Sequence, residues 1–299
     1  MATVQVTAFR VSAPVLAKLK DYYTLTKPEV NLLILMTTSA GYYLGTQGVF
    51  RILGLVNTLI GTLLVACGTA TLNQFMERAY DARMRRTSSR PVASGRMAAR
   101  EALAFGIFLS LAGGLYLWWT VNPLAAVLAI STLLSYLLIY TPLKRVTPLC
   151  TLLGAFPGAM PTLIGWAGAS AGLSRQAWSL FAVLFLWQFP HFLAIALLYR
   201  EDYAHAGYRM LPAFDNEGRF TRAEIVTTTL LLILVTMIPF AGVNHARLYL
   251  PAVFVAGVFF LYYGIRLAYS ASRASAGRLV HASVIYLPLV LGMMVACKP

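Results

Sequence analysis

Charged residues are scarce in this chain. Only 11% of its 299 residues are Asp, Glu, Lys or Arg, whereas 59% are apolar, and the mean hydropathy is +0.70. A soluble globule of this length could not cover its surface with so few polar side chains. The composition therefore excludes an ordinary soluble domain and predicts an integral membrane protein.

Cysteine is also rare. Cys67, Cys150 and Cys297 lie far apart, and no C-x-x-C or Cys/His zinc pattern occurs. Neither a disulfide scaffold nor a cysteine metal site is expected. The sequence also has no secretory signal pattern, because Lys18 and Asp21 interrupt any apolar stretch near its start.

Long apolar runs are abundant, and spanning a bilayer takes about 20 mostly apolar residues. Nine runs fit this length: 30–48, 52–72, 102–120, 124–141, 148–168, 177–198, 225–243, 249–269 and 280–297. They predict an all-α membrane protein with about nine transmembrane helices. Residues 1–29 would form a cytoplasmic lead-in, and residues 30–298 a single transmembrane domain. Five prolines inside the runs are expected to bend or break their helices: Pro157, Pro161, Pro190, Pro239 and Pro288.

The charges give this topology an orientation. With the N-terminus inside, all of the 24 Lys and Arg residues face the cytoplasm except Arg51, Arg175, Arg247 and Lys298. All ten acidic residues fall on the same side, although the positive-inside rule does not concern them. Carboxylates gathered with arginines on one face indicate a site at that face. Because the basic residues follow the topology and form no recognised module, no nucleic-acid partner is expected.

A row of three side chains that carry oxygen atoms follows the second run. Asn73, Glu77 and Asp81 recur at every fourth residue, which on an α-helix leaves them nearly in line over ~12 Å. Such side chains suit a hard cation such as Mg²⁺. Arg86 and Arg90 follow, and their guanidinium groups suit a diphosphate. A solvated helix end followed by cytoplasmic arginines explains the same pattern without any site.

A faint repeat links this row to a second segment. The second helix ends at NQFMERAYD (73–81) and the sixth at YREDYAHAG (199–207), with four helices between them. Both ends therefore emerge on one side. A duplication would place them face to face across a central cavity.

Six motifs now stand in order along the chain. They are the N-x-x-x-E-x-x-x-D row, RTSSRP (86–91), YTPLKR (140–145), GAMPTLIGW (158–166), WQFPHF (187–192) and REDYAHAGYRMLP (200–212). Together they resemble the protohaem IX farnesyltransferases, or haem O synthases, of the UbiA-type prenyltransferase superfamily. The resemblance runs from about Lys27 to Tyr286. It implies a ring of nine transmembrane helices around a central cavity, in the cell inner membrane, with the active-site mouth cytoplasmic.

The resemblance also implies substrates and partners. The enzyme would transfer the farnesyl group of farnesyl diphosphate to the 2-vinyl group of haem B, with Mg²⁺ as cofactor, giving haem O and diphosphate. The product would pass to a haem A synthase or to oxidase assembly factors. Asn73, Glu77 and Asp81 would be the first metal motif and Asp202 the remaining carboxylate of the second. Relatives acting on quinone precursors have a further Asp four residues on, where this chain has Ala206.

Basic and aromatic residues complete the expected site. Mg²⁺ and cations neutralise the charge that builds on a departing diphosphate. We assign Arg86, Arg90, Lys144 and Arg145, with Asp81, to catalysis. Substrate contacts are expected from Lys27, Asn31, Tyr140, His191, Arg200 and Tyr203.

For three of these residues, two different roles fit the sequence. His191 either contacts the haem, as an axial ligand does, or hydrogen-bonds a neighbouring helix. Lys27 contacts either the diphosphate or a haem propionate. Asn31 either points into the mouth or packs.

Two other functions fit the same sequence. One is polyprenyl transfer to an aromatic quinone precursor, which the RTSSRP, WQFPHF and REDY motifs disfavour. The other is a membrane protein that transports or handles haem without catalysis. Transporters usually place charged groups near the membrane midplane, whereas these carboxylates lie at one mouth.

Overall fold

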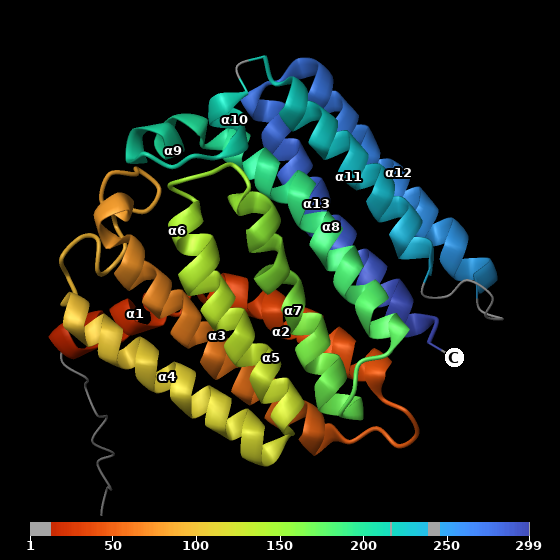
Figure 1. Ribbon diagram of the computed structural model, residues 1–299, viewed down its shortest axis with the longest axis horizontal. Coiled ribbons are helices and arrows are strands. Elements are labelled where there is room, and N and C mark those ends of the chain that lie inside the picture. The colour runs from red at the N-terminus through yellow and green to blue at the C-terminus, as the bar shows by residue number, and fades with distance from the viewer. Residues whose placement is uncertain (1–12, 216, 239–245, 299) are drawn as a thin grey trace, which may run out of the picture.

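The computed structural model describes residues 13–215, 217–238 and 246–298. Every regular element in these residues is a helix (Figure 1). The lead-in contains α1 (Ala13–Leu25), and nine longer segments follow it. They are α2 (Pro28–Gly45), α3 (Ile52–Asp81), α4 (Ala99–Thr120), α5 (Pro123–Leu134) with its extension, α7 (Cys150–Ser170), α8 (Arg175–Leu198), α11 (Arg219–Met237), α12 (Ala246–Ser270) and α13 (Arg273–Ala296). Two short helices, α9 (Arg200–Ala206) and α10 (Leu211–Phe214), join α8 to α11.

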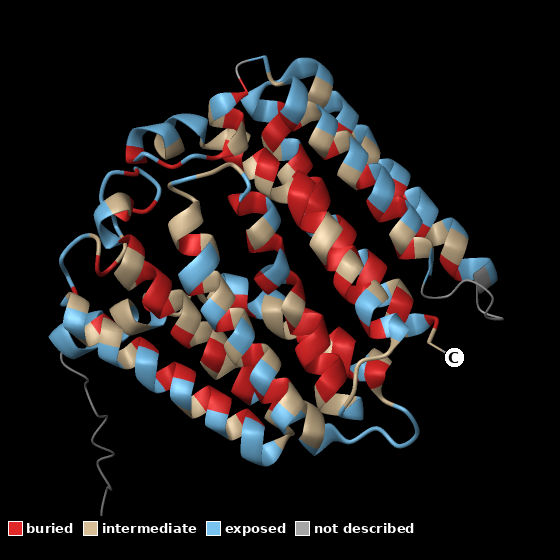
Figure 2. Cartoon of the chain, viewed as in Figure 1, coloured by how far each residue is buried: buried red, intermediate tan, exposed pale blue. Residues whose placement is uncertain are grey.

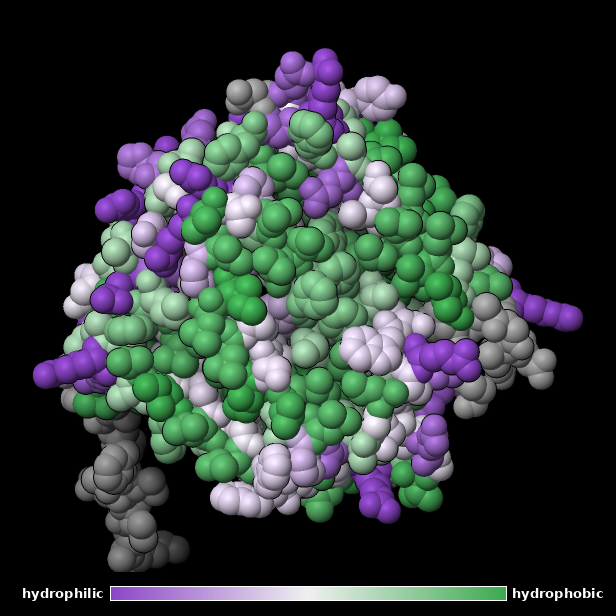
Figure 3. All heavy atoms as spheres, in the orientation of Figure 1, coloured by the Kyte–Doolittle hydropathy of each residue, from purple (hydrophilic) through white to green (hydrophobic). Residues whose placement is uncertain are grey.

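The predicted membrane fold is confirmed. Eight helices among the described residues are long and apolar enough to cross a membrane, and α2 is a ninth long helix. Figure 3 shows apolar residues over the middle of the visible face and hydrophilic residues gathered toward its edges. Large apolar side chains such as Phe108 and Val255 are 66% exposed. Lipid is the solvent that makes such exposure favourable.

Neighbouring helices pack in chain order, and α13 returns to contact α2. The inner helices are α7 and α8. In the apolar stretch of each, 72% and 61% of the residues are buried. Figure 2 shows this burial along α7 and α8, whereas α4 and α12 are exposed along their outer faces. Successive long helices run in opposite directions (Figure 1). One end of the molecule therefore holds the ends of α3, α6 and α8 and the starts of α4, α7, α11 and α13.

Close helix contacts depend on glycine where α2 crosses α7. A Cβ atom on Gly41 would overlap the backbone carbonyl of Thr162, and one on Gly165 would overlap that of Thr38. The two backbones touch, which larger residues would prevent. This contact fixes the start of α2, and Lys27 before it, relative to the other helices.

Local signals explain most helix starts. Pro28 and Pro123 occupy first turns, where a missing N–H costs nothing. The side chain of Asn122 accepts from the N–H of Ala125 at 2.9 Å. Asp215 Oδ2 accepts from the N–H of Thr221 at 2.7 Å and so caps α11.

The structure corrects several boundaries. Helix α11 begins at Arg219 rather than 225, and α13 at Arg273 rather than 280, because polar residues form their first turns. The run 124–141 ends in a π-helical turn, η1 (Ser135–Tyr140), and a last helical turn, α6 (Thr141–Leu143).

Of the bend or break expected at each proline, the break does not occur at four of them. Helix α7 continues through Pro157 and Pro161, α8 through Pro190 and α13 through Pro288. Neighbouring helices pack on each of them and support the helix around the missing backbone hydrogen bond. Pro239 lies outside the described residues.

Candidate active site

The predicted row lies on the last two turns of α3. Asn73, Glu77 and Asp81 are 1%, 3% and 2% exposed, so the row is not a solvated helix end. Each side chain meets one cation. Lys27 Nζ donates to Asn73 Oδ1 at 3.1 Å, Lys144 Nζ to Glu77 Oε1 at 3.0 Å, and Arg90 Nη1 to both oxygens of Asp81 at 2.7 Å.

Lys27 reaches the row from an unusual backbone position. Its φ of 50° and ψ of 64° are left-handed, a conformation that is rare for a residue with a side chain. Pro28 follows and begins α2. Burial, with the charge of Arg90, lowers the pKa of Lys27 to about 7. An anion bound here would favour the charged form of Lys27.

The π-helical turn η1 supports Lys144. Tyr136 and Tyr140 lie on this turn with ring centroids 5.0 Å apart, and Lys144 Nζ is 4.3 Å from the Tyr140 centroid. Thr141, the next residue, accepts a hydrogen bond from Asn73 Nδ2 at 3.2 Å. The YTPLKR motif thus contacts the row through the Thr141 hydroxyl group and the Lys144 ammonium group, and its Tyr140 ring lies beside that ammonium group.

The loop after the first repeat segment (73–81) contacts the second repeat segment (199–207). Arg85 Nε lies 3.6 Å from Asp202 Oδ1, and Arg86 donates to the hydroxyl of Tyr203 at 3.0 Å. The Arg86 guanidinium also lies over the Tyr199 ring, 4.8 Å from its centroid. The loop after α3 is therefore joined to α9 by an ion pair, a hydrogen bond and a cation–π contact.

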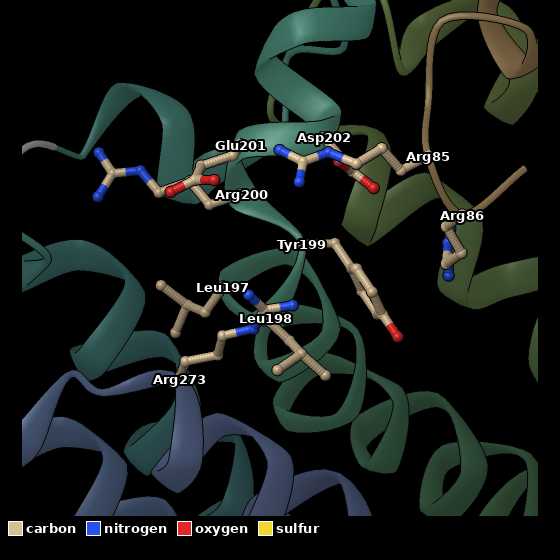
Figure 4. A pocket seen from close by; sticks show the side chains of 9 residues that line it. All are labelled: Arg85, Arg86, Leu197, Leu198, Tyr199, Arg200, Glu201, Asp202 and Arg273. Carbon is tan, nitrogen blue, oxygen red and sulfur yellow. The ribbon is translucent and has the colours of Figure 1, made fainter.

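A pocket of about 500 Å³ opens at this junction (Figure 4). Its walls come from the loop after α3, the end of α8, α9 and the start of α13. The lining residues are Arg85, Arg86, Leu197, Leu198, Tyr199, Arg200, Glu201, Asp202 and Arg273. Arg200 and Asp202, both expected at the site, are among them.

The segment after α9 closes the site from a third side. The N–H of Arg209 donates to the carbonyl of Lys144 at 2.7 Å. Burial and the neighbouring Glu77 carboxylate raise the pKa of Tyr208, so its hydroxyl stays protonated. Ala206 is fully buried in the cluster that contains Tyr208 and Met210. The position where quinone-type relatives have a second Asp is thus a packing position.

Three of the predicted site residues have their contacts outside the row: Arg145, Asn31 and His191. Arg145 stacks over Tyr80 at 3.9 Å and donates to the carbonyl of Met76 at 3.4 Å, so it braces α3. Asn31 is buried and donates to the carbonyl of Thr26 and to Cys67 Sγ, which is the packing alternative.

His191 lies lower on α8. Its Nδ1 is 2.7 Å from Ser283 Oγ on α13, and its ring stacks on Trp187. The helix–helix hydrogen bond expected of an intramembrane histidine is therefore present. A contact with haem remains a prediction.

The donor set fits a magnesium ion that shares its shell with a substrate. Among the described residues, no cluster of three or more His, Cys, Asp and Glu side chains could hold a metal. The row instead offers two carboxylates and one amide oxygen. Mg²⁺ typically takes one or two carboxylates and completes its octahedron with phosphate oxygens and water. The three cations facing the row would then be free to contact a diphosphate.

Sequence reasoning missed Thr141, Tyr208 and Arg273. Thr141 lies in the YTPLKR motif and Tyr208 in the REDYAHAGYRMLP motif, but nothing in the spacing of either residue indicates a role in the site. Arg273 opens an ordinary helix and reaches the pocket only through the packing of α13 on α8. The three cysteines are free, and Cys150 packs against Met210 with its sulfur 3.6 Å from Sδ.

These features define a membrane enzyme with a polar, cation-rich mouth above an apolar helical bundle. The model of the UbiA prenyltransferase family matches residues 34–286, and the chain belongs to that family. It is 47% identical over 290 residues to the "Protoheme IX farnesyltransferase" of Solibacter usitatus, covering 94% of this chain and 99% of the relative. It is 43% identical to the protein of the same name from Koribacter versatilis, covering 92% of each.

Solved structures share the fold at low sequence identity. A digeranylgeranylglyceryl phosphate synthase superimposes with a TM-score of 0.77 at 18% identity, over 94% of this chain and 99% of that chain. A UbiA homologue from Archaeoglobus fulgidus bound to GPP and Mg²⁺ gives 0.68 at 15% identity, over 92% and 99%. The predicted resemblance is confirmed, and the chain is a multi-pass membrane prenyltransferase.

Proposed function

We propose that the chain transfers the farnesyl group of farnesyl diphosphate to the 2-vinyl group of haem B, releasing diphosphate and forming haem O. The observation that carries the transfer chemistry is the buried row Asn73, Glu77 and Asp81, faced by three cations. The haem acceptor is supported by relatives at 47% and 43% identity, which are named for protohaem IX.

The row and its cations divide the work on the diphosphate. Mg²⁺ held by Asn73, Glu77 and Asp81, with Asp202 from the facing segment, would neutralise charge on the departing diphosphate. A family relative of the same fold was solved with GPP and Mg²⁺, which supports this assignment. Lys27, Lys144 and Arg90 would turn from the row toward the phosphate oxygens. Arg86, held by Tyr199 and Tyr203, supplies a planar fork from the opposite side.

The apolar bundle below the mouth protects the reactive allyl group. Loss of diphosphate leaves an allylic cation, which the electron-rich vinyl group captures by forming a carbon–carbon bond. Water then adds to the resulting cation and a proton is lost, giving a hydroxyethylfarnesyl group. Premature water would give farnesol, so the site has to be dry during the first step. Tyr136 and Tyr140 present aromatic faces there, which favour positive charge.

Orientation follows from the charges. The carboxylates and most of the basic residues in the described part of the chain lie at the same end of the helices as the pocket, and we place this end and the N-terminus on the cytoplasmic side of the inner membrane. Water-soluble diphosphate would then leave directly into the cytoplasm. A following haem-oxidising enzyme would take the product from the bilayer.

The test is direct. Purified protein is incubated with farnesyl diphosphate, Mg²⁺ and haem B, and the products are separated and weighed by mass spectrometry. A mass increase equal to one farnesyl group plus one hydroxyl group on intact haem is expected. If haem B is unchanged while a quinone precursor is prenylated, the acceptor is wrong. If neither acceptor reacts, the protein handles haem without catalysis.

A further inference from the structure

A buried amide holds the turn between α1 and α2, which carries Lys27. The Nε2 group of Gln74, on α3, donates to the carbonyl oxygens of Thr24 and Leu25 at 3.2 and 3.0 Å. Gln74 is 1% exposed and Leu25 is fully buried. Because both neighbouring atoms are carbonyl oxygens, only the NH2 group of the amide can face them. The end of α1 is thus attached to α3.

Asn31 holds the same turn from α2. Its Nδ2 group donates to the carbonyl of Thr26 at 2.7 Å, and the residue is 3% exposed. Three successive carbonyl groups, at positions 24 to 26, therefore accept hydrogen bonds from buried side chains. Lys27 comes next, with its left-handed backbone. Such a conformation costs free energy for a lysine and persists only where the surrounding contacts determine it.

Two neighbouring residues of α3 hold the two ends of Lys27. Gln74 fixes the backbone of the turn, whereas Asn73 Oδ1 accepts from the Lys27 ammonium group at 3.1 Å. Neighbouring side chains on a helix project about 100° apart, so Asn73 can face the site while Gln74 faces the lead-in. A movement of the turn would therefore move the ammonium group relative to the metal row.

Stability alone gives little reason for this amide. Gln74 Oε1 has no hydrogen-bond partner among the described residues, and an unpaired buried polar atom costs free energy. The lead-in also has other attachments. Lys18 pairs with Glu101 at 2.8 Å, and Leu25 packs in an apolar cluster with Met97. These contacts hold α1 against α4 and the loop before it without Gln74. What Gln74 adds is a fixed position of the turn.

We propose that Gln74, assisted by Asn31, is a positioning residue for the transfer reaction. It fixes the turn so that the Lys27 ammonium group lies beside Asn73, where it can meet the diphosphate. The inference rests on the proposed function, in which Lys27 contacts the phosphate oxygens. Gln74 itself touches no substrate. Its effect has to pass through Lys27, so its loss weakens binding of farnesyl diphosphate rather than of haem B.

A double-mutant cycle tests whether Gln74 acts through Lys27. Full-length protein in nanodiscs is assayed as wild type, Gln74→Met, Lys27→Met and the double variant. Methionine is an unbranched side chain without a donor. Loss of the Lys27 contact should raise the KM for farnesyl diphosphate about tenfold, and its displacement in Gln74→Met about three- to fivefold. The double variant should match Lys27→Met. The KM for haem B should stay within about twofold throughout.

Three results would overturn the proposal. If the double variant shows the product of the two single effects, roughly 30- to 50-fold, Gln74 acts independently of Lys27. If Gln74→Met lowers the melting temperature but leaves the KM for farnesyl diphosphate unchanged, the amide only supports the fold. If the KM values for both substrates rise together, the substitution distorts the whole site.

Gln188 supplies a matched control. It is 3% exposed, and its Nε2 group also donates to two carbonyl oxygens, those of Ala155 and Leu184, at 2.9 and 3.2 Å. Gln188→Met should lower the melting temperature much as Gln74→Met does. Its effect on the KM for farnesyl diphosphate should be the same with and without Lys27. Coupling to Lys27 that is seen for Gln74 alone supports positioning, and equal coupling of Gln188 overturns it.

A second variant covers the case in which Gln74→Met does not fold. Asn31→Leu removes the other amide of the turn and keeps a side chain of similar shape. It then takes the place of Gln74→Met in the cycle and should show the same dependence on Lys27. An effect of Asn31→Leu that is independent of Lys27 overturns the proposal.

A binding measurement separates this inference from the proposed function. If wild type yields no farnesylated haem, the cycle is repeated by calorimetry with Mg²⁺ and farnesyl thiodiphosphate, a slowly reacting analogue. Dissociation constants with the same non-additive pattern support the positioning role even though the acceptor is wrong. Additive effects, or no binding of the analogue to wild type, overturn it.

Discussion

Arg90 contacts both carboxylate oxygens of Asp81 at 2.7 Å, nine residues along the same chain. Asp81 is almost fully buried, while Arg90 reaches it from the loop that follows α3. This bidentate pair neutralises one candidate metal ligand. It also gives the buried carboxylate a positively charged partner before a metal ion and a diphosphate bind.

The first prediction concerns this pair. Arg90→Gln leaves the Asp81 carboxylate buried without its partner. We expect a loss of about 2 kcal/mol, below the usual value for a buried pair because 22% of the Arg90 side chain is exposed. The apparent melting temperature in nanodiscs should fall by roughly 4–6 °C. Adding Asp81→Asn should recover most of this loss. Equal losses in the single and double variants would show that the pair contributes nothing.

The second prediction concerns the metal row. Asp81→Asn and Glu77→Gln keep the shape of each side chain but remove a negative charge. Turnover should fall at least ~100-fold, while haem binding followed by absorbance stays within about twofold. Glu217→Gln is the matched control, because Glu217 is 67% exposed and pairs with Arg219 at the surface. Full turnover in both row variants would remove the row from the chemistry.

The third prediction concerns the shape of a cation. Arg86→Lys keeps the positive charge but loses the planar fork that lies over Tyr199 and donates to Tyr203. Activity should fall about tenfold, with most of the change in kcat. Tyr203→Phe removes only the hydrogen bond and should cost about two- to fivefold. An unchanged rate in Arg86→Lys would place Arg86 outside the site.

Local patterns predicted the parts of this molecule that depend on local physics. Bilayer thickness sets the length of an apolar run, and the helical period aligns Asn73 with Asp81. Both follow from residues close together in the chain. The starts of α11 and α13 were expected too late because Arg219 and Arg273 are polar residues in membrane helices, where a hydropathy window misses them.

Contacts between distant elements could not be read in this way. Thr141 meets Asn73, and Arg209 meets Lys144, because of how α6 and the segment after α9 dock on α3. No local period records that docking. No break occurs at Pro157 or Pro190 for the same reason, since neighbouring helices decide whether a proline interrupts its helix. Arg145 is a charged residue of the YTPLKR motif, yet its guanidinium group packs over the Tyr80 ring.

The fourth prediction concerns the helix crossing that places Lys27. Gly41→Ala would put a Cβ atom into the backbone carbonyl of Thr162, and backbone cannot yield as a flexible side chain does. Helices α2 and α7 must separate, at a cost of about 1–3 kcal/mol. Gly292→Ala on α13 is the control, because a Cβ there meets no atom within 4 Å. It should be neutral or slightly stabilising. Separation of α2 from α7 also moves Lys27 away from Asn73, so Gly41→Ala should raise the KM for farnesyl diphosphate in the molecules that remain folded. A normal melting temperature and a normal KM in Gly41→Ala would mean that the crossing tolerates more space than this geometry allows.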